Sequence, residues 1–353
     1  MKFLIVAAKT GGHVFPAVSV ARELIKNNHE IVFLGTGSKI EKDAYKNVSS
    51  KTYELSMMGF RGGNAIKKCT AIYQGFLNIF KVLQIINKEK IDGMFGFGGF
   101  ITVPAGIGCW LKRKPVFLHE QNAILGSANK LLSKISKLNF LGFPITGISK
   151  SVLSGNPIRE SFITNLENTN FSNKEDPIRI YITGGSQGAE YFNKQIPSIF
   201  EDFPFNIKIK HQCGQNNLSE VKDMYLSHSI KAEVAEFYEN PAEQMLWSDF
   251  VISRGGALSL SEITSLNRGA IIIPLPTSID NHQLHNARHI ENMKMGIIHQ
   301  QTQSLENLKQ ILSNIIKNET FVSWKENANK TNINSTTIIV NQVEEYFKIN
   351  EAI

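Results

Sequence analysis

The residues best suited to chemistry are polar and titratable side chains in short loops, several of them rich in glycine. Three of these loops read Thr10-Gly11-Gly12-His13, His119-Glu120-Gln121-Asn122 and Gly184-Gly185-Ser186-Gln187-Gly188-Ala189. Each follows a short apolar run, as expected after a buried strand. Loops beyond the carboxyl ends of parallel strands meet helix N-termini, whose N–H groups and dipoles favour anions. The loops therefore predict a phosphorylated ligand.

The common signatures of nucleotide and metal sites are missing. No G-x-x-x-x-G-K-[ST] sequence occurs, no G-x-G-x-x-G follows the first apolar run, and no D-x-D pair is present. Helix dipoles and arginine side chains would have to replace a metal if the ligand is a nucleotide sugar. His282, His285 and His289 would share one helix face, but hydrogen bonding near a helix start is the favoured interpretation. We expect no metal and no cofactor.

The loop at 184–188 also fits the G-x-S-x-G pattern of a hydrolase nucleophile elbow. Asp249 and His282 or His289 follow it in the order of a catalytic triad. Short patterns of this kind recur by chance in glycine-rich loops, and no HGGG-like oxyanion loop precedes this one. A phosphate-contacting Ser186 is therefore favoured over a nucleophile.

The elements that must position these loops are apolar runs alternating with helical patterns, which is typical of βα units around a parallel sheet. This alternation of apolar runs and helical patterns occurs in two series along the 353 residues, so we expect two α/β domains. Their boundary is predicted near Gly155-Asn156-Pro157, giving domains at 1–157 and 158–337 with a polar linker at 165–176. Helical spacing of apolar residues predicts a closing helix at 338–353 that packs back on the first domain.

Cysteine usage and hydropathy indicate the cellular compartment in which the protein is expected. The three cysteines are far apart and form no C-x-x-C pair, which supports neither a disulfide framework nor a cysteine zinc site. A reducing cytoplasm fits best. No uncharged apolar stretch reaches the roughly 18 residues of a membrane-spanning helix.

The charge is distributed unevenly. The net charge is +7, yet residues 1–157 hold 21 basic and 8 acidic residues, whereas residues 158–353 hold 17 and 23. This asymmetry indicates an anionic partner for the first half, either nucleic acid or the cytoplasmic face of a membrane. An equally weighted alternative is that the lysines only aid solubility. Nucleic acid is disfavoured because no helix-turn-helix, RRM or zinc-finger pattern organises the charge.

A segment between 72 and 86 carries apolar residues at helical spacing, and its default interpretation is core packing. Further apolar residues widen the face beyond one stripe, and basic residues flank it. This combination is typical of interfacial membrane docking. The residues assigned to that surface are Lys67, Lys68, Phe76, Phe80, Lys81 and Trp110.

Seven motifs, in order, resemble the MurG family of peripheral membrane glycosyltransferases. The resemblance runs from Thr10 to about Ala287. Besides the three loops above, its anchors are Gly98-Gly99-Phe100-Ile101-Thr102-Val103-Pro104, Gly155-Asn156-Pro157-Ile158-Arg159, Gly256-Ala257-Leu258-Ser259-Leu260-Ser261-Glu262 and Asp280-Asn281-His282-Gln283 with Asn286-Ala287.

The resemblance implies an α/β GT-B fold, in which two Rossmann-like domains face a cleft. The family moves N-acetylglucosamine (GlcNAc) from UDP-GlcNAc, with inversion, to the MurNAc 4-hydroxyl of undecaprenyl-pyrophosphoryl-MurNAc-pentapeptide. This step converts lipid I to lipid II in peptidoglycan synthesis. The implied location is peripheral, on the cytoplasmic face of the bacterial inner (plasma) membrane. The implied partners are UDP-GlcNAc, lipid I, the anionic membrane surface and proteins of cell-wall synthesis and division.

The same resemblance implies roles for individual residues. Ser186 meets the donor diphosphate and Glu262 the ribose, while Tyr238 meets uracil through its backbone. The implied donor contacts are Thr10, Gly11, Gly12, Asn122, Arg159, Ser186, Tyr238, Ala257, Leu258, Ser259, Leu260, Ser261, Glu262 and, on the GlcNAc hydroxyls, Gln283. The acceptor contacts are Lys9, Gly98, Gly99 and Phe100. The base is either His13 or Glu120, with His13 favoured.

Two positions depart from the family pattern. Ala8-Lys9 stands where two glycines usually begin the first loop, and Phe100 stands where tyrosine is common. Lys9 is expected to supply charge in place of backbone N–H groups. Two other functions remain as alternatives: another GT-B enzyme for a UDP-sugar, such as a glycolipid glucosyltransferase or a UDP-GlcNAc epimerase, and a UDP-sugar-binding or scaffold protein without catalysis.

Overall fold

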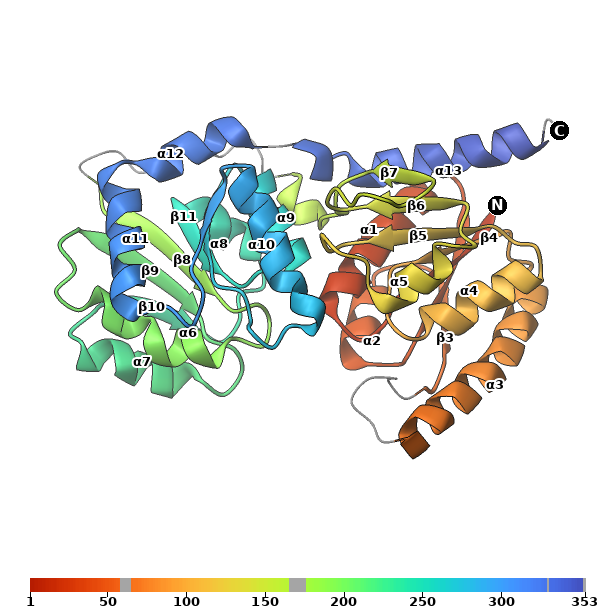
Figure 1. Cartoon of the computed structure of the whole chain (residues 1–353), viewed down its shortest axis with the longest axis horizontal. Coiled ribbons are helices and arrows are strands. Elements are labelled where there is room, and N and C mark those ends of the chain that lie inside the picture. Colours follow the sequence, from red (N-terminus) through yellow and green to blue (C-terminus); the bar gives the residue numbers. More distant parts are fainter. Residues whose placement is uncertain (58–64, 165–175, 329, 352–353) are drawn as a thin grey trace. The chain divides into compact units, whose positions relative to one another are not determined.

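The computed structural model describes residues 1–57, 65–164, 176–328 and 330–351, with the side chains of 65–69 and 351 excepted. It divides into two compact units (Figure 1). The first unit comprises Met1–Arg159 and Thr331–Ile353, and the second comprises Glu160–Lys330. The linker predicted at 165–176 falls almost wholly outside the described residues.

The first unit is built on a seven-stranded parallel sheet in the order β3-β2-β1-β4-β5-β6-β7. Its strands are β1 (Lys2–Val6), β2 (Glu30–Gly35), β3 (Lys51–Glu54), β4 (Gly93–Gly96), β5 (Val116–Glu120), β6 (Leu138–Leu141) and β7 (Ser151–Leu153). Its helices are α1 (Gly11–Lys26), α2 (Lys39–Tyr45), α3 (Ala65–Glu89), α4 (Thr102–Leu111), α5 (Ser127–Leu132) and α13 (Ser335–Glu351).

The second unit repeats the design with a six-stranded parallel sheet in the order β10-β9-β8-β11-β12-β13. Its strands are β8 (Ile178–Thr183), β9 (Ile207–Gln212), β10 (Ala232–Ala235), β11 (Phe250–Ser253), β12 (Ala270–Ile272) and β13 (Gly296–Ile298). Its α-helices are α6 (Glu190–Gln195), α7 (Leu218–Ser227), α8 (Pro241–Trp247), α9 (Ala257–Ser265), α10 (His282–Asn292), α11 (Leu305–Lys317) and α12 (Thr320–Trp324). The expectation of two Rossmann-like α/β domains is confirmed.

Both sheets contain a point where the strand order reverses. In the first unit β1 lies between β2 and β4, and in the second unit β8 lies between β9 and β11. Ligands of open α/β sheets bind outside the carboxyl ends of the strands at such switch points. The loops that follow β1, β4, β8 and β11, together with the first turns of α1 and α9, carry most of the predicted site residues. The topology therefore places those residues where ligand binding is expected.

Alternation of side chains along β1 fills two separate cores. Phe3 and Ile5 point to a core shared with α1 and α13, whereas Leu4 and Val6 point to a core shared with α3 and α4. All four side chains are fully buried. This two-sided burial explains the uninterrupted apolar sequence of the strand.

The terminal helix α13 packs on the sheet of the first unit. Val340 and Val343 are fully buried there, and the Phe347 ring lies 5.8 Å from the ring of Phe3. The chain leaves this unit after Arg159 and returns at Thr331, close to the boundaries expected at 157 and 338.

Hydrogen bonds explain where the chain crosses between units. The Gly155 carbonyl accepts from His119 Nε2 at 3.0 Å and from Ser335 Oγ at 2.8 Å. The backbone N–H of Asn156 donates to Asn332 Oδ1 at 2.8 Å. A Cβ at Gly155 would lie 2.8 Å from that same oxygen, so glycine allows the two crossing segments to touch. Both crossings are thereby fixed to the end of β5.

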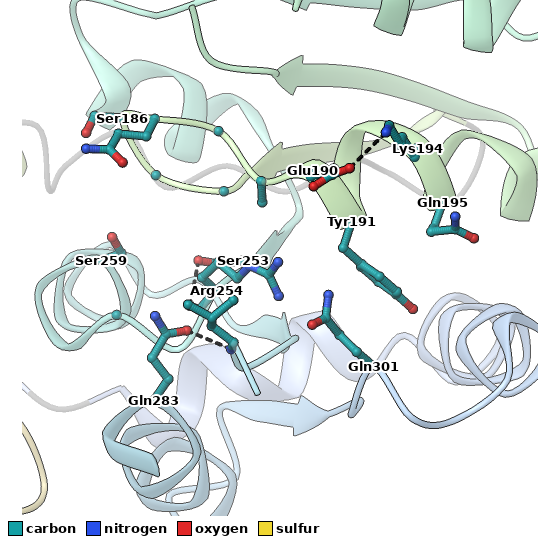
Figure 2. Close-up of a pocket in the computed structure, with 17 residues that line it drawn as sticks. Ser186, Glu190, Tyr191, Lys194, Gln195, Ser253, Arg254, Ser259, Gln283 and Gln301 are labelled. Atoms are coloured by element: carbon teal, nitrogen blue, oxygen red, sulfur yellow. Dashed lines mark hydrogen bonds and ion pairs between the residues drawn. The ribbon is translucent and has the colours of Figure 1, made fainter. Parts of the chain in front are cut away.

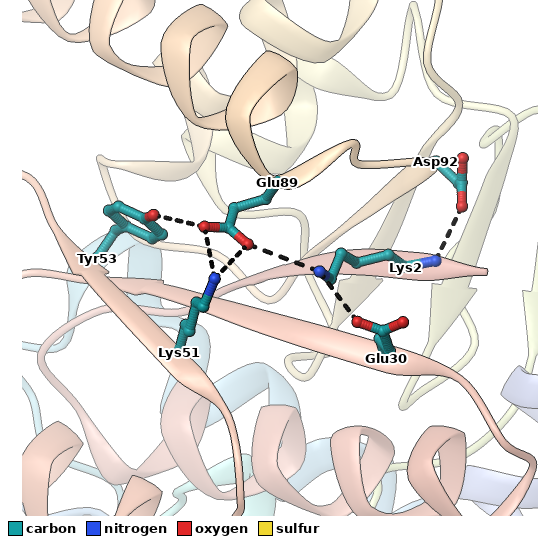
Figure 3. Close-up of polar contacts among 6 residues, drawn as sticks. All are labelled: Lys2, Glu30, Lys51, Tyr53, Glu89 and Asp92. Carbon is teal, nitrogen blue, oxygen red and sulfur yellow. Dashed lines mark hydrogen bonds and ion pairs between the residues drawn. The ribbon is translucent and has the colours of Figure 1, made fainter.

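The end of α3 is tied to the sheet through Glu89 (Figure 3). Its carboxylate accepts hydrogen bonds from Tyr53 Oη at 2.7 Å and Lys51 Nζ at 3.1 Å, and it lies 3.6 Å from Lys2 Nζ. The side chain is only 2% exposed. The Tyr53 hydrogen bond, followed by the hydrogen bond and charge of Lys51 and the charge of Lys2, lowers the pKa of Glu89 below its ordinary value of 4.5, even though burial opposes this.

We therefore predict that Glu89→Gln destabilises the protein at neutral pH and much less in acid. A carboxylate with a lowered folded-state pKa stabilises the fold above its unfolded-state pKa, and this contribution is lost as pH falls through the folded-state value. Urea unfolding of variant and wild type at pH 7 and at about pH 4 tests this, because the gap should narrow at the lower pH.

The matched control is Asp43→Asn, which removes an exposed partner of Lys46. Exposed ion pairs contribute little, so this variant should unfold almost like the wild type at pH 7. An equal destabilisation by Glu89→Gln at both pH values would contradict the assignment.

Candidate active site

The second unit contains a cavity of about 900 Å³ at the carboxyl ends of β8 and β11 (Figure 2). The predicted donor residues Ser186, Ser259 and Gln283 line it, together with the glycine loop at 184–188. The loop is held against the end of β9, because a Cβ at Gly188 would overlap the Cys213 carbonyl oxygen. The φ angles of Gly185 (88°) and Gly188 (73°) lie in the left-handed region that favours glycine.

Gln283 has a fixed amide orientation. Its Oε1 accepts hydrogen bonds from the backbone N–H groups of Gly255 at 3.2 Å and Leu275 at 2.9 Å. The Nε2 group is therefore the part of the amide that can donate to a ligand in the cavity. Sugar hydroxyls accept such hydrogen bonds.

Helix α9 begins directly after Gly255-Gly256 and brings its first N–H groups to the same cavity. Those groups have no acceptor within the helix and favour an anion. Ser259 faces the cavity, whereas Leu258, Leu260 and Ser261 are buried in the unit. These three residues can offer a ligand only their backbone.

Of the predicted donor residues, Ser186, Ser259 and Gln283 line this cavity, and the others, Glu262 and Tyr238 among them, do not. Glu262 is 2% exposed, within α9. Tyr238 donates its backbone N–H to Gln212 Oε1 at 3.3 Å and its hydroxyl to Glu233 Oε1 at 2.9 Å. A backbone contact from Tyr238 to a base would therefore use its carbonyl or compete with Gln212.

The cavity also holds residues that the motifs did not identify. The Arg254 guanidinium lies 4.6 Å over the Phe192 ring and donates to the Ile273 carbonyl at 3.1 Å. Burial lowers the pKa of Arg254. Its place directly before Gly255-Gly256 was a usable signal. Nothing in the sequence distinguished Tyr191, Lys194, Gln195 and Gln301, which also line the cavity.

The hydrolase alternative is wrong. Ser186 follows the carboxyl end of β8, but Asp249 precedes β11, which runs parallel to β8. Asp249 therefore lies at the amino-terminal ends of these strands, opposite Ser186. There it accepts hydrogen bonds from the Arg179 backbone N–H at 2.7 Å and from the Arg179 guanidinium at 3.1 Å. His282 Nδ1 donates instead to the Ile279 carbonyl. Among the described residues, no group of three or more His, Cys, Asp or Glu side chains is arranged to hold a metal.

The first unit brings His13 and the loop after β4 together. His13 Nδ1 lies 3.2 Å from the Ala8 carbonyl oxygen and 3.2 Å from Thr10 Oγ1. A carbonyl can only accept, so in the neutral ring Nδ1 carries the proton and Nε2 the lone pair. A Cβ on Gly98, whose φ is 96°, would lie 3.1 Å from Nε2, so glycine leaves the space that this nitrogen faces.

Glu120 organises the loop that follows β5. Its Oε1 accepts from the backbone N–H and the side-chain amide of Asn122, both at 3.1 Å. Its Oε2 accepts from Gly126 N and Asn129 Nδ2, both at 2.9 Å. Four donors occupy the acceptor capacity of a carboxylate, and the side chain is buried. Any substrate hydroxyl would have to displace one of them.

The neighbouring His119 is a neutral structural residue. It is fully buried, and burial lowers its pKa to about 4. Its Nε2 donates to the Gly155 carbonyl and its Nδ1 accepts from Gln121 Nε2 at 3.1 Å. At neutral pH it therefore bears no charge. Arg159 lies in the same unit with its guanidinium 5.2 Å over the Phe15 ring.

Helix α3 exposes a broad apolar face. Phe76 is 58% exposed and Phe80 is 51% exposed, while Val82 and Ile85 on the other face are buried. The remaining exposed apolar side chains of α3 are Ile72, Tyr73 and Leu77, and Trp110 at the end of α4 is 54% exposed. Lys81 is exposed, and the side chains of Lys67 and Lys68 lie outside the described residues. No helix in the described part of the chain has the length and apolar character needed to cross a bilayer.

Known proteins match the chain along almost its whole length. Residues 3–139 match the glycosyltransferase family 28 N-terminal domain, and residues 179–343 match the corresponding C-terminal domain. Curated relatives are named UDP-N-acetylglucosamine–N-acetylmuramyl-(pentapeptide) pyrophosphoryl-undecaprenol N-acetylglucosamine transferase. The one from Haemophilus influenzae is 33% identical over 98% of both chains, and the one from Buchnera aphidicola is 37% identical over 92% of both. The chain belongs to this family of GlcNAc transferases.

Solved structures agree with this membership. The MurG crystal structure from Acinetobacter baumannii has a TM-score of 0.81 and 28% identity, covering 98% of this chain and 99% of its own. A UDP-GlcNAc 2-epimerase from Neisseria meningitidis has a TM-score of 0.66 at 15% identity, a likeness that shows the fold alone. The resemblance to MurG inferred from the seven motifs is confirmed.

Proposed function

We propose that the protein is an inverting transferase that moves GlcNAc from UDP-GlcNAc to the MurNAc 4-hydroxyl of lipid I, giving lipid II. The observation that carries the proposal is the cavity of the second unit, where a glycine loop, the start of α9 and the fixed Gln283 amide converge. Membership of the GlcNAc transferase family supports the same conclusion.

The donor roles follow from the chemistry of the cavity. The N–H groups at the start of α9, with Ser186 and Ser259, stabilise the negative charge that develops on the leaving UDP. The Gln283 Nε2 donates to GlcNAc hydroxyls, because its Oε1 is already engaged by two backbone N–H groups. Glu262 remains proposed for the ribose and Tyr238 for the uracil. Thr10, Gly11, Gly12, Asn122 and Arg159 remain proposed as further donor contacts.

His13 is proposed as the base. As the acceptor oxygen forms its bond to the sugar C1, the bond from C1 to the UDP oxygen breaks and UDP leaves with the electron pair. The hydroxyl proton passes to His13 Nε2, the nitrogen with the lone pair when Nδ1 donates to Ala8. The Ala8 carbonyl also stabilises the imidazolium that results.

Glu120 is better suited to positioning than to proton transfer. Its carboxylate is saturated by the Asn122, Gly126 and Asn129 donors. We therefore propose that it holds Asn122 in place for the substrates. Lys9, Gly98 and Gly99 are proposed to contact the acceptor, and Phe100 is proposed to support this acceptor side through its contact with Lys9.

The apolar face of α3 is proposed to dock on the cytoplasmic face of the bacterial inner membrane. The exposed Phe76 and Phe80 rings lie 5.1 Å apart, and Trp110 adds to the apolar surface. Lysines 67, 68 and 81 would add about 1 kcal/mol each near anionic lipid. A peripheral location gives access to a lipid-linked acceptor, and it would allow contact with proteins of cell-wall synthesis and division.

We predict that His13→Ala lowers kcat about 10²-fold or more while UDP-GlcNAc binding is retained, the usual scale for a lost general base. Glu120→Gln should instead lower thermal stability, because an amide cannot accept from all four donors, with a smaller loss of kcat. Turnover with a soluble lipid I analogue measures kcat, calorimetry measures UDP-GlcNAc binding, and thermal unfolding measures the stability of each variant. A larger loss of kcat in Glu120→Gln than in His13→Ala would contradict the assignment.

Membrane docking makes a separate prediction. The variant Phe76→Ser with Phe80→Ser should bind anionic vesicles less tightly, and replacing Lys67, Lys68 and Lys81 by Gln should weaken binding most at low salt. Vesicle sedimentation measures the binding. Because docking is distinct from chemistry, both variants should still use a soluble acceptor analogue. Equal loss on vesicles and on the soluble acceptor would reject the docking role.

A further inference from the structure

The two positions where the chain departs from its family's pattern touch each other. Lys9 Nζ lies 4.7 Å from the centre of the Phe100 ring, a cation–π distance. Phe100 is half-buried and packs against the core that contains Leu4 and Val6. Gly99 brings this loop against Ala8, since a Cβ there would lie 2.9 Å from the Ala8 Cβ. The ring therefore has a fixed place beside the first loop.

The backbone of Lys9 is held from the other side by Glu41. Lys9 has a φ of 64°, in the left-handed region that a non-glycine residue seldom adopts. Its N–H donates to Glu41 Oε1 at 2.8 Å. The same carboxylate accepts from Thr36 Oγ1 at 2.7 Å, Thr36 N at 2.6 Å and Gly37 N at 2.9 Å. Glu41 is 1% exposed.

Glu41 stays ionised in this setting. Burial favours the neutral acid, but the hydrogen bonds from Lys9 and Thr36 outweigh it and lower the pKa of Glu41 below its ordinary value. Because the Lys9 N–H is occupied, the residue cannot offer a ligand the backbone donor that a glycine loop would. Its remaining polar donor is the ammonium, and Lys9 is an exposed residue. In the described part of the chain, no carboxylate forms an ion pair with it.

We propose that Glu41 and Phe100 are positioning residues that aim the Lys9 ammonium at an anionic diphosphate group of the acceptor. Glu41 fixes the backbone that carries the side chain, and the ring of Phe100 holds the cation without neutralising it. The contact to the acceptor is thus made by a charge on a side chain in place of loop N–H groups. This inference rests on the proposed function.

The test is direct binding of a fluorescent, water-soluble acceptor analogue with a short prenyl diphosphate, measured apart from transfer and without lipid vesicles. Lys9→Gly removes the ammonium at a backbone position that suits glycine, and Lys9→Arg keeps the charge. Lys150→Gly is the matched control, because Lys150 is also exposed and its backbone also adopts the left-handed conformation, with a φ of 52°. Phe100→Leu is made alone and together with Lys9→Gly.

Lys9→Gly should raise the Kd of the analogue about tenfold and weaken its dependence on salt, the scale of one lost charged hydrogen bond. UDP-GlcNAc binding should be unchanged, and Lys9→Arg and Lys150→Gly should both resemble the wild type. Phe100→Leu should raise the Kd alone but add nothing to Lys9→Gly, because the ring acts through the lysine.

Equal Kd values for Lys9→Gly and Lys150→Gly would overturn the inference, as would a Phe100→Leu effect that persists without the lysine. Failure of the wild type to bind the analogue would overturn it too. A wild type that binds the analogue through Lys9 but transfers no GlcNAc would support the inference and reject the proposed function. If the wild type transfers GlcNAc but its binding of the analogue does not depend on Lys9, the proposed function is supported and this inference is rejected.

Discussion

Two buried carboxylates hold the loops of the first unit at the edge where substrates are expected. Polypeptide beyond a strand end has lost its ladder partners, and each buried N–H left unsatisfied costs about 1–3 kcal/mol. Glu41 collects donors from Lys9, Thr36 and Gly37, and Glu120 collects donors from Asn122, Gly126 and Asn129. An ionised carboxylate can accept about four hydrogen bonds, so one side chain satisfies a whole loop. The functional side chains are thereby fixed before any ligand arrives.

The second unit fixes its loops in a different way, and this difference suits its proposed ligand. Its glycine loop is held by close backbone approach at Gly188, and Gln283 is held by the N–H groups of Gly255 and Leu275. Among the described residues that line that cavity, Glu190 is the one carboxylate, and it forms an ion pair with Lys194 at 2.8 Å. The N–H groups at the start of α9 are thus the donors proposed for an anionic diphosphate. In the first unit carboxylates satisfy the loop N–H groups, whereas the second unit offers helix N–H groups to its proposed nucleotide-sugar ligand.

The sequence predicted the fold well because strand, glycine loop and helix recur at short range. It identified Ser186, Ser259 and Gln283 through motifs adjacent to strand ends, where topology brings them together. It did not identify Glu41, because its partners Lys9 and Thr36 meet it only once β1 and β2 are paired. Nor could the sequence show whether Glu120 anchors its loop or acts as the catalytic base, because that depends on the hydrogen bonds it accepts from Gly126 and Asn129. Which face of α3 is exposed likewise depends on its packing against the sheet and α4.

The proposed transfer of GlcNAc to a lipid-linked sugar would use only the side chains and helix N-termini of this two-unit fold. The most direct test is an assay with radiolabelled UDP-GlcNAc and excess EDTA, with and without a soluble lipid I analogue. We expect label to move to the lipid in EDTA, and only when the acceptor is present. Tight binding of UDP-GlcNAc without transfer to the acceptor would rule out the proposed transfer, as would release of free GlcNAc at the same rate with and without the acceptor.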